Sequence, residues 1–271
     1  MTQKADLIIT PRWIVPVRPA QQVFTDSSLA IKGGKIVSVG LTGDLLQAFP
    51  GSQQLVLGEH LLMPGLINAH GHAAMTLFRG LADDLPLMEW LNDHIWPAEG
   101  KFVDADFVSA GATLAISEML KGGTTTFSDM YFFPESTAEA AMNAGMRCQL
   151  ATPILDFPSA WAASADEYIH KGIALQDEYR HSDLVKIAFG PHAPYTVSDA
   201  PLKQISVLAN QVDAPIQIHL HETAFEVDEA VQKTGQRPIE RLAGLSLLSA
   251  NTQCVHMTQL TDSDMALLQE T

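Results

Sequence analysis

A regular alternation of buried strands and amphipathic helices begins at residue 64 and constrains the fold of this chain more than any other feature. The segment GLINAHGH (65–72) is typical of a buried strand, and DADFVSAGATLAISEMLKGG (104–123) has a helical pattern that ends at a glycine pair. Similar strand-then-helix pairs follow, with strands expected at 124–132, 148–155, 184–195, 214–222 and 252–257. Such alternation predicts an α/β fold with a parallel sheet and helices outside it.

Six units of this kind indicate a (β/α)8 TIM-type barrel over residues 64–271. A complete barrel of this type needs about 250 residues, more than the chain provides after residue 64. The last residues also fall within a helical pattern that has no stop signal. We therefore expect the two C-terminal units to be missing from this chain.

Residues 1–63 have a different residue pattern, which predicts a small β-rich domain. Val, Ile and Leu dominate three segments that Gly, Pro and Asp separate, namely 5–17, 28–40 and 53–63. The Gly33-Gly34 pair in the second segment predicts a tight hairpin turn.

Composition narrows the class of function. The net charge of −15 disfavours an extended nucleic-acid surface, which needs a basic face, but permits a small-molecule substrate. Two cysteines are too few for a disulfide framework, and no apolar stretch reaches the ~20 residues that a membrane span needs. We expect a cytoplasmic protein with no membrane or nucleic-acid partner; a homo-oligomer remains open.

Histidines gather where the predicted strands end, which is the rim that carries the active site in such barrels. Four strand ends contribute them: His70 and His72, His192, His219 and His221, and His256. Buried imidazoles need polar partners, and imidazole suits zinc, so the pattern predicts a metal site with zinc first and another divalent metal as the alternative. No lysine ends the third or fourth strand, which favours one ion per chain. The other four histidines are expected to be solvated in loops or helices.

Strand geometry suggests which histidines share a face. Residues i and i+2 of a strand point to the same side, so His70 and His72 are expected to point inward together. His219 and His221 share the same parity, which leaves both open as ligands. Glu222 follows directly and could move protons beside a metal-activated water without binding the metal itself.

Three segments, MPGLINAHGHAAMTLFRG (63–80), GPHAPY (190–195) and IHLHET (218–223), resemble the amidohydrolase superfamily. Within it, the segment at 75–99 and GPHAPY are similar to those of the 5′-methylthioadenosine/S-adenosylhomocysteine deaminases. The similarity extends over essentially the whole chain. It implies a barrel closed by a small β domain that both chain ends build.

The resemblance also implies roles for individual residues. The metal ligands would be His70, His72 and His219, which selects His219 over His221. Glu222 would be the proton shuttle and would also contact the substrate. Glu99 would hold the ribose hydroxyls, His192 would lie in the substrate pocket, and Trp90 would belong to the segment that covers the substrate.

Three departures from the family pattern concern the site. The sixth strand reads QCVH, with Gln253 where a histidine is common, so either His256 or Gln253 takes the catalytic role at that strand. Arginines that hold an amino-acid tail in some members are not evident in 148–161, which favours methylthioadenosine over the homocysteine-bearing substrate. The aspartate of strand eight would lie beyond residue 271, so this exact chain would be impaired in catalysis.

The predicted reaction is hydrolytic deamination of the adenine ring of 5′-methylthioadenosine, S-adenosylhomocysteine or adenosine, which yields the inosine analogue and ammonia. A metal-activated water would attack C6 while Glu222 delivers a proton to N1, the pattern of zinc deaminases that act on bases. The alternatives are another amidohydrolase, such as a guanine deaminase or triazine hydrolase, or a non-catalytic metal-binding relative.

Overall fold

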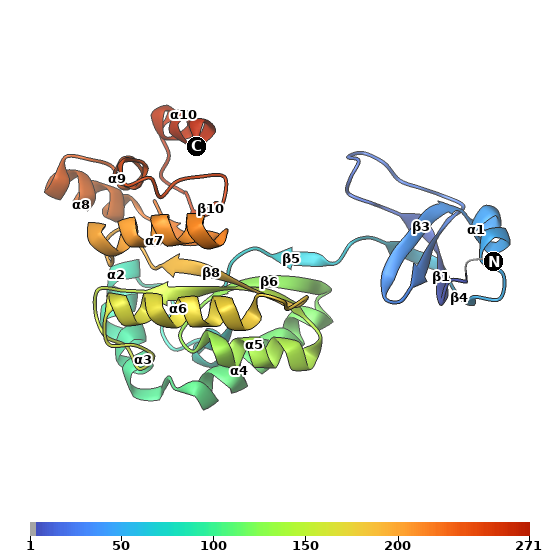
Figure 1. Ribbon diagram of the computed structural model, residues 1–271, viewed down its shortest axis with the longest axis horizontal. Coiled ribbons are helices and arrows are strands. Elements are labelled where there is room, and N and C mark those ends of the chain that lie inside the picture. Colours follow the sequence, from blue (N-terminus) through green and yellow to red (C-terminus); the bar gives the residue numbers. More distant parts are fainter. Residues whose placement is uncertain (1–3) are drawn as a thin grey trace. The chain divides into compact units, whose positions relative to one another are not determined.

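The structure, a computed structural model, describes residues 4–271 (Figure 1). It divides the chain into two compact units, Met1–Gly65 and Leu66–Thr271. The division falls close to residue 63, where the character of the sequence changes.

The smaller unit is a four-stranded sheet in the order β3-β2-β1-β4, with one short helix beside it. Its elements are β1 (Leu7–Ile14), β2 (Ser27–Lys32), β3 (Lys35–Leu41), α1 (Thr42–Ala48) and β4 (Gln53–Leu62). Strands β2 and β3 pair antiparallel, and the glycines between them have φ of 56° and 74°. Such positive φ values are those of the tight hairpin turn, which confirms the turn predicted at Gly33-Gly34.

The larger unit is built on a curved sheet of parallel strands in the order β10-β9-β8-β7-β6-β5. The strands are β5 (Leu66–Asn68), β6 (Thr124–Met130), β7 (Arg147–Ile154), β8 (Val185–Pro191), β9 (Ile216–Leu220) and β10 (Thr252–His256). Figure 1 shows helices along the outside of this sheet. The α/β fold class and the six-unit alternation predicted from the sequence are confirmed.

A helix follows each strand. The principal helices are α4 (Ala105–Lys121), α5 (Pro134–Ala144), α6 (Ala165–Tyr179), α7 (Asp199–Val212), α8 (Ala224–Thr234), α9 (Pro238–Gly244) and α10 (Asp262–Glu270). Side chains fix several of their starts: Asp104 accepts a hydrogen bond from the Phe107 amide at 2.8 Å, and Thr261 accepts one from the Asp264 amide at 3.3 Å. Gly145 ends α5 in the left-handed conformation, with φ of 66°.

An insertion of short helices separates β5 from α4. It consists of η1 (Ala73–Phe78, a 3₁₀ helix), α2 (Leu87–Glu89), η2 (Trp90–Ile95, a π-helical segment) and α3 (Trp96–Phe102). Because η1 starts directly after His72, its packing helps to hold the segment that carries His70 and His72.

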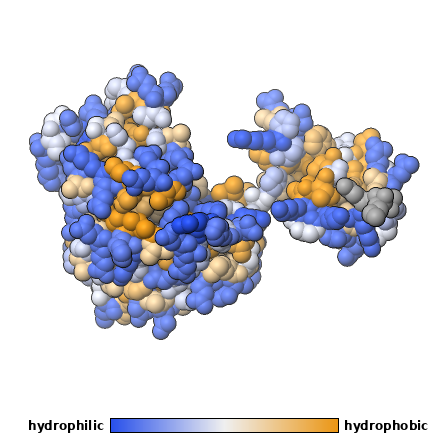
Figure 2. All heavy atoms as spheres, in the orientation of Figure 1, coloured by the Kyte–Doolittle hydropathy of each residue, from blue (hydrophilic) through white to orange (hydrophobic). Residues whose placement is uncertain are grey.

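The main hydrophobic core of this unit includes buried residues from the strands and the outer helices, such as Phe127, Leu150, Ile187, Tyr168 and Ile205. Hydrophilic side chains cover much of the outer helices, while hydrophobic ones gather between α6 and α7 in the view of Figure 2. Among residues 4–271, no helix has the length and apolar character needed to cross a membrane.

One close backbone contact ties α4 to η1, the segment that follows His72. A Cβ added to Gly111 of α4 would lie 2.5 Å from the carbonyl oxygen of Ala74 in η1. We predict that Gly111→Ala lowers the free energy of unfolding by about 1–3 kcal/mol, because the two backbones must move apart.

Chemical denaturation measures that loss. Gly244→Ala in α9 is the matched control, since nothing lies within 4 Å of its added methyl group. This control is expected to change stability by less than about 1 kcal/mol. Equal stability of the two variants would contradict the packing argument.

Candidate metal and substrate site

Three histidines form the centre of the candidate site. One ring nitrogen from each of His70, His72 and His219 lies within 4.8 Å of the others, and Nε2 of His219 is 3.1 Å from Nε2 of His70. His219 lies in β9. His70 and His72 do not lie on a strand, because β5 ends at Asn68 and both histidines occupy the connection to η1. The expectation that they end the first strand is therefore wrong, although the structure does bring them together.

Hydrogen bonds to Nδ1 orient each of the three rings. His72 Nδ1 is 2.6 Å from the Met130 carbonyl oxygen, and His219 Nδ1 is 2.8 Å from the His192 carbonyl oxygen. Because a carbonyl oxygen only accepts, both Nδ1 atoms must carry the hydrogen. Each Nε2 therefore keeps a free lone pair directed at the same point. Ring orientation of this kind is the usual support of a metal-binding histidine.

His70 is oriented by a side chain instead of the backbone. Its Nδ1 lies 3.2 Å from Oε1 of Gln217. The Gln217 amide nitrogen donates to Ser128 Oγ at 2.7 Å and to Gln253 Oε1 at 2.8 Å, so its oxygen must face the ring. Hence His70 also carries its hydrogen on Nδ1 and has a free Nε2.

Burial keeps four imidazoles uncharged at neutral pH, those of His70, His72, His192 and His219. It lowers the pKa of His72 to about 4 and that of His192 to about 3, and it also lowers the pKa values of His70 and His219. A divalent metal ion needs neutral imidazole with a free lone pair. Three neutral rings with converging Nε2 atoms thus fit a zinc ion, and they leave room for further ligands.

The polar layer beneath the histidines was not predicted from the sequence, which singled out only Gln253 of its members. Gln149 of β7, Gln217 of β9 and Gln253 of β10 form a hydrogen-bonded layer with Ser128 of β6. A signal was available: Gln217 shares strand parity with His219, and a glutamine within an otherwise apolar buried strand needs an internal partner. The structure also places Gln253 in this layer, where its amide donates to the Ala69 carbonyl oxygen at 2.5 Å.

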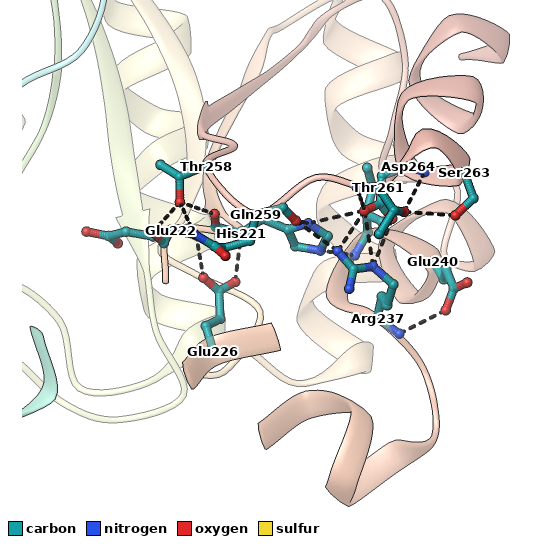
Figure 3. Close-up of polar contacts among 11 residues, drawn as sticks. His221, Glu222, Glu226, Arg237, Glu240, Thr258, Gln259, Thr261, Ser263 and Asp264 are labelled. Atoms are coloured by element: carbon teal, nitrogen blue, oxygen red, sulfur yellow. Dashed lines mark hydrogen bonds and ion pairs between the residues drawn. The ribbon is translucent and has the colours of Figure 1, made fainter. Parts of the chain in front are cut away.

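The backbone distinguishes His219 from His221, which strand parity left open. His221 follows β9 and adopts a left-handed φ of 52°. Its buried ring turns toward α9 and α10, where Nε2 accepts from the Ile239 amide at 3.2 Å and Nδ1 donates to the Gln259 carbonyl oxygen at 3.0 Å (Figure 3). Both ring nitrogens of His221 are thus engaged away from the three-histidine cluster.

Glu222 and His256 form a pair beside the cluster. Oε1 of Glu222 lies 3.5 Å from Nε2 of His256, and the ring of His256 stacks on that of His219 with centroids 5.4 Å apart. Burial raises the pKa of Glu222, and its electrostatic interaction with His256 opposes this shift. A raised pKa makes this carboxyl group a better proton acceptor than a solvated glutamate.

A cavity adjoins the cluster and contains the other predicted site residues. Its lining includes His72, Trp90, Glu99 and His192, together with mainly apolar side chains of the η2–α3 segment and of the loop after β7. His72 therefore belongs both to the metal cluster and to the wall of the cavity. His70, His219, Glu222 and His256 do not line it.

Glu99 is the charged residue of this wall. Its Oε1 accepts a hydrogen bond from the Tyr131 hydroxyl at 2.8 Å. Burial raises the pKa of Glu99 to about 7, and the bond from Tyr131 opposes the shift. A half-ionised carboxylate in an apolar cavity is a strong acceptor for hydroxyl groups of a bound ligand.

Comparison with known proteins identifies the family. The model of the amidohydrolase family matches residues 61–271, so the chain belongs to this family, and the resemblance seen in the sequence is confirmed. A relative from Saccharophagus degradans, named 5-methylthioadenosine/S-adenosylhomocysteine deaminase, is 57% identical over 270 residues, which are 99% of this chain and 60% of that protein. The chain thus spans about 60% of the length of this relative.

Two solved structures share the fold. An adenosine deaminase from Xanthomonas campestris, crystallised with bound zinc, has a TM-score of 0.97 and 44% identity, covering 100% of this chain and 62% of its own. The atrazine chlorohydrolase of Arthrobacter aurescens, also complexed with zinc, has a TM-score of 0.88 at 19% identity, covering 97% of this chain and 63% of its own. At this level of identity the second likeness shows the fold alone.

We predict that Gln217→Leu weakens zinc binding by about 10- to 100-fold, because His70 loses the acceptor that fixes its tautomer. Competition with a chromophoric chelator measures the affinity. Gln149→Leu is the matched control, since Gln149 belongs to the same polar layer but bonds to Ser128 and Gln253 and to no histidine. Equal zinc affinity of the two variants would show that Gln217 does not orient His70.

Proposed function

We propose that this protein is a zinc-dependent hydrolase that deaminates the adenine ring of a nucleoside, with 5′-methylthioadenosine as the preferred substrate and S-adenosylhomocysteine and adenosine as further candidates. One observation carries the proposal: three neutral imidazoles lie together beside a cavity whose wall includes both His72 and Glu99, a buried carboxyl group suited to a ribose. The 57% identical relative named as such a deaminase supports the same assignment.

His70, His72 and His219 would hold the ion through their Nε2 atoms. When bound, zinc supplies Lewis acidity that lowers the pKa of a water molecule toward neutrality. The fit rests on the donor set described above, three neutral rings whose other nitrogen is already hydrogen-bonded.

Glu222 would move the protons of the reaction. Its carboxylate accepts a proton from the attacking water and returns it to N1 of the adenine ring, which makes C6 more electrophilic. The hydroxyl group added at C6 would then give its proton to the amino group, so that the C–N bond breaks, ammonia leaves and the C6 carbonyl forms. His256, 3.5 Å from Glu222, would orient this carboxylate and the water. We prefer His256 to Gln253 for the role at β10, because the Gln253 side chain is engaged with Gln217 and Ala69.

The cavity would hold the rest of the nucleoside. Glu99 would accept hydrogen bonds from the vicinal ribose hydroxyls, His192 would contact the purine, and Trp90 would cover the substrate. Apolar lining residues such as Met75, Leu155 and Phe157 suit an uncharged thioether substituent better than a charged amino-acid tail.

The proposal extends to a reducing compartment such as the cytoplasm. Burial raises the pKa of Cys148 to about 12 and that of Cys254 to about 11, so both thiols stay protonated and unreactive. Neither cysteine forms a disulfide.

Glu222→Gln is expected to lower kcat for 5′-methylthioadenosine by at least about 100-fold while zinc stays bound, because an amide cannot shuttle a proton. The change of the adenine spectrum to that of hypoxanthine measures turnover, and atomic absorption measures zinc. Glu229→Gln is the control, because Glu229 lies in α8 and forms an ion pair with Lys233. Normal turnover of Glu222→Gln would refute the assignment, and zinc-loaded natural protein that releases no ammonia from any purine nucleoside would refute the function.

Glu99 predicts a pH dependence. Its pKa of about 7 means that the carboxyl group is protonated below this pH and ionised above it. Because the ionised form accepts hydrogen bonds from the ribose, kcat/KM is expected to rise as the pH increases through about 7. Glu99→Gln should lower kcat/KM and remove this rise.

Tyr131→Phe provides a second test of the same group. The Tyr131 hydroxyl donates to Glu99 and lowers its pKa, so its removal should shift the rise to higher pH.

A free base or a triazine has no vicinal diol. Activity of the natural protein on a free base or a triazine, without activity on any nucleoside, would favour a guanine deaminase or a triazine hydrolase instead.

A further inference from the structure

Many hydrogen bonds fix the backbone around Glu222, whereas few polar contacts fix its side chain. Among the described residues, the Glu222 carboxylate has only His256 as a close polar partner, at 3.5 Å. By contrast, the four backbone polar groups of His221 and Glu222 are all hydrogen-bonded (Figure 3). The direction of the Glu222 side chain is therefore set through its peptide groups.

Glu226 accepts the hydrogen bonds of the two amide groups. Its Oε1 accepts from the His221 amide at 3.1 Å, and its Oε2 accepts from the Glu222 amide at 2.7 Å. One carboxylate thus bridges two consecutive peptide groups at the end of β9. Figure 3 shows Glu226 on one side of this turn, with the Glu222 side chain directed away from the His221 ring.

This arrangement differs from ordinary helix capping. Glu226 is the third residue of α8, and a glutamate at this position normally reaches back to the amide of the N-cap residue. Glu240 in α9 does so, since its Oε2 accepts from the Arg237 amide at 2.8 Å. Glu226 instead reaches past its own N-cap, Thr223, to the two preceding residues.

Thr258 closes the turn from the other side. Its Oγ1 donates to the Glu222 carbonyl oxygen at 2.7 Å, and its amide donates to the His221 carbonyl oxygen at 3.0 Å. The loop after β10 is itself fastened to α9 and α10. Arg237 bonds through its guanidinium to both oxygens of Asp264 and to the Gln259 carbonyl oxygen.

The turn needs this support because it is strained. His221 has a φ of 52°, in the left-handed region that costs a residue with a Cβ about 1–3 kcal/mol. Glu226 is only 6% exposed and has no cationic side chain bonded to it among residues 4–271. The first peptide groups of α8 and the two bridged amides stabilise its charge there. The hydrogen bonds from the His221 and Glu222 amides explain why a carboxylate is buried at this place.

We propose that Glu226 is a positioning residue for Glu222: its carboxylate clamps the His221 and Glu222 amides and so aims the Glu222 side chain at the reacting ring. The role of Glu222 itself rests on the proposed function. Glu226 touches neither the metal ligands nor the cavity lining.

The test compares Glu226→Gln with Glu240→Gln in the natural full-length protein loaded with zinc. Glu226→Gln keeps the size but turns an NH2 group toward one of the two amides. We expect kcat to fall about 10- to 100-fold, the effect of a misplaced reacting group, while KM stays within about twofold and zinc content is unchanged. Glu240→Gln removes an equivalent carboxylate from the first turn of a helix that does not touch Glu222, and should leave kcat unchanged. Equal kcat for both variants, or a loss carried by KM or by zinc content, would overturn the proposal.

Amide hydrogen exchange tests the clamp independently of the reaction. In Glu226→Gln the segment that contains His221 and Glu222 should exchange about tenfold faster or more, while Glu240→Gln leaves it unchanged. Unchanged exchange in Glu226→Gln overturns the proposal even if the natural protein has no deaminase activity. Inactivity of the natural protein on every nucleoside tested, with the exchange effect present, would instead refute the proposed function and leave the clamp established.

Discussion

The site depends on the hydrogen bonds to the Nδ1 atoms of His70, His72 and His219. Each bond fixes a tautomer, and three fixed tautomers direct three free Nε2 lone pairs to one point. Without these bonds the rings could rotate, and neutral imidazoles would only be polar groups buried at a cost. Two of the acceptors are backbone carbonyl groups of β6 and of the residue after β8, so the curved parallel sheet itself sets the orientation of these rings.

Two buried side chains extend this control beyond the metal ligands. Gln217 lies beneath His70 within a polar layer to which four strands contribute. Glu226 lies behind Glu222 and bonds to two of the peptide groups that carry it. In the proposed function both would act through another residue, where a misplacement of about 1 Å affects the reacting atoms. The strained turn at His221 shows that the fold stores conformational energy directly before Glu222.

Periodicity and glycine placement were sufficient to predict the architecture. The strand–helix alternation predicted the order of the larger unit, and Gly33-Gly34 predicted the hairpin of the smaller one. The site was predicted in outline, because parallel strands bring their carboxyl ends to one rim. His70 and His72 show the limit of that argument: β5 ends two residues before His70, so an irregular segment and not a strand face places them.

The hydrophobic pattern of the sequence predicts the strand order, and residue counts give the acidic composition. The sequence by itself therefore determined which residue types could lie near one another. Only the tertiary structure decided which of them do. His219 and His221 have the same parity, and the left-handed turn at His221 separates them because the partners of its ring lie on α9 and in the loop before α10. Gln217 and Glu226 also depend on tertiary contacts. Gln217 bonds to residues far along the chain, and Glu226 bonds to two residues that precede the N-cap of its own helix. Local patterns contain no information on such contacts, because packing sets their distances.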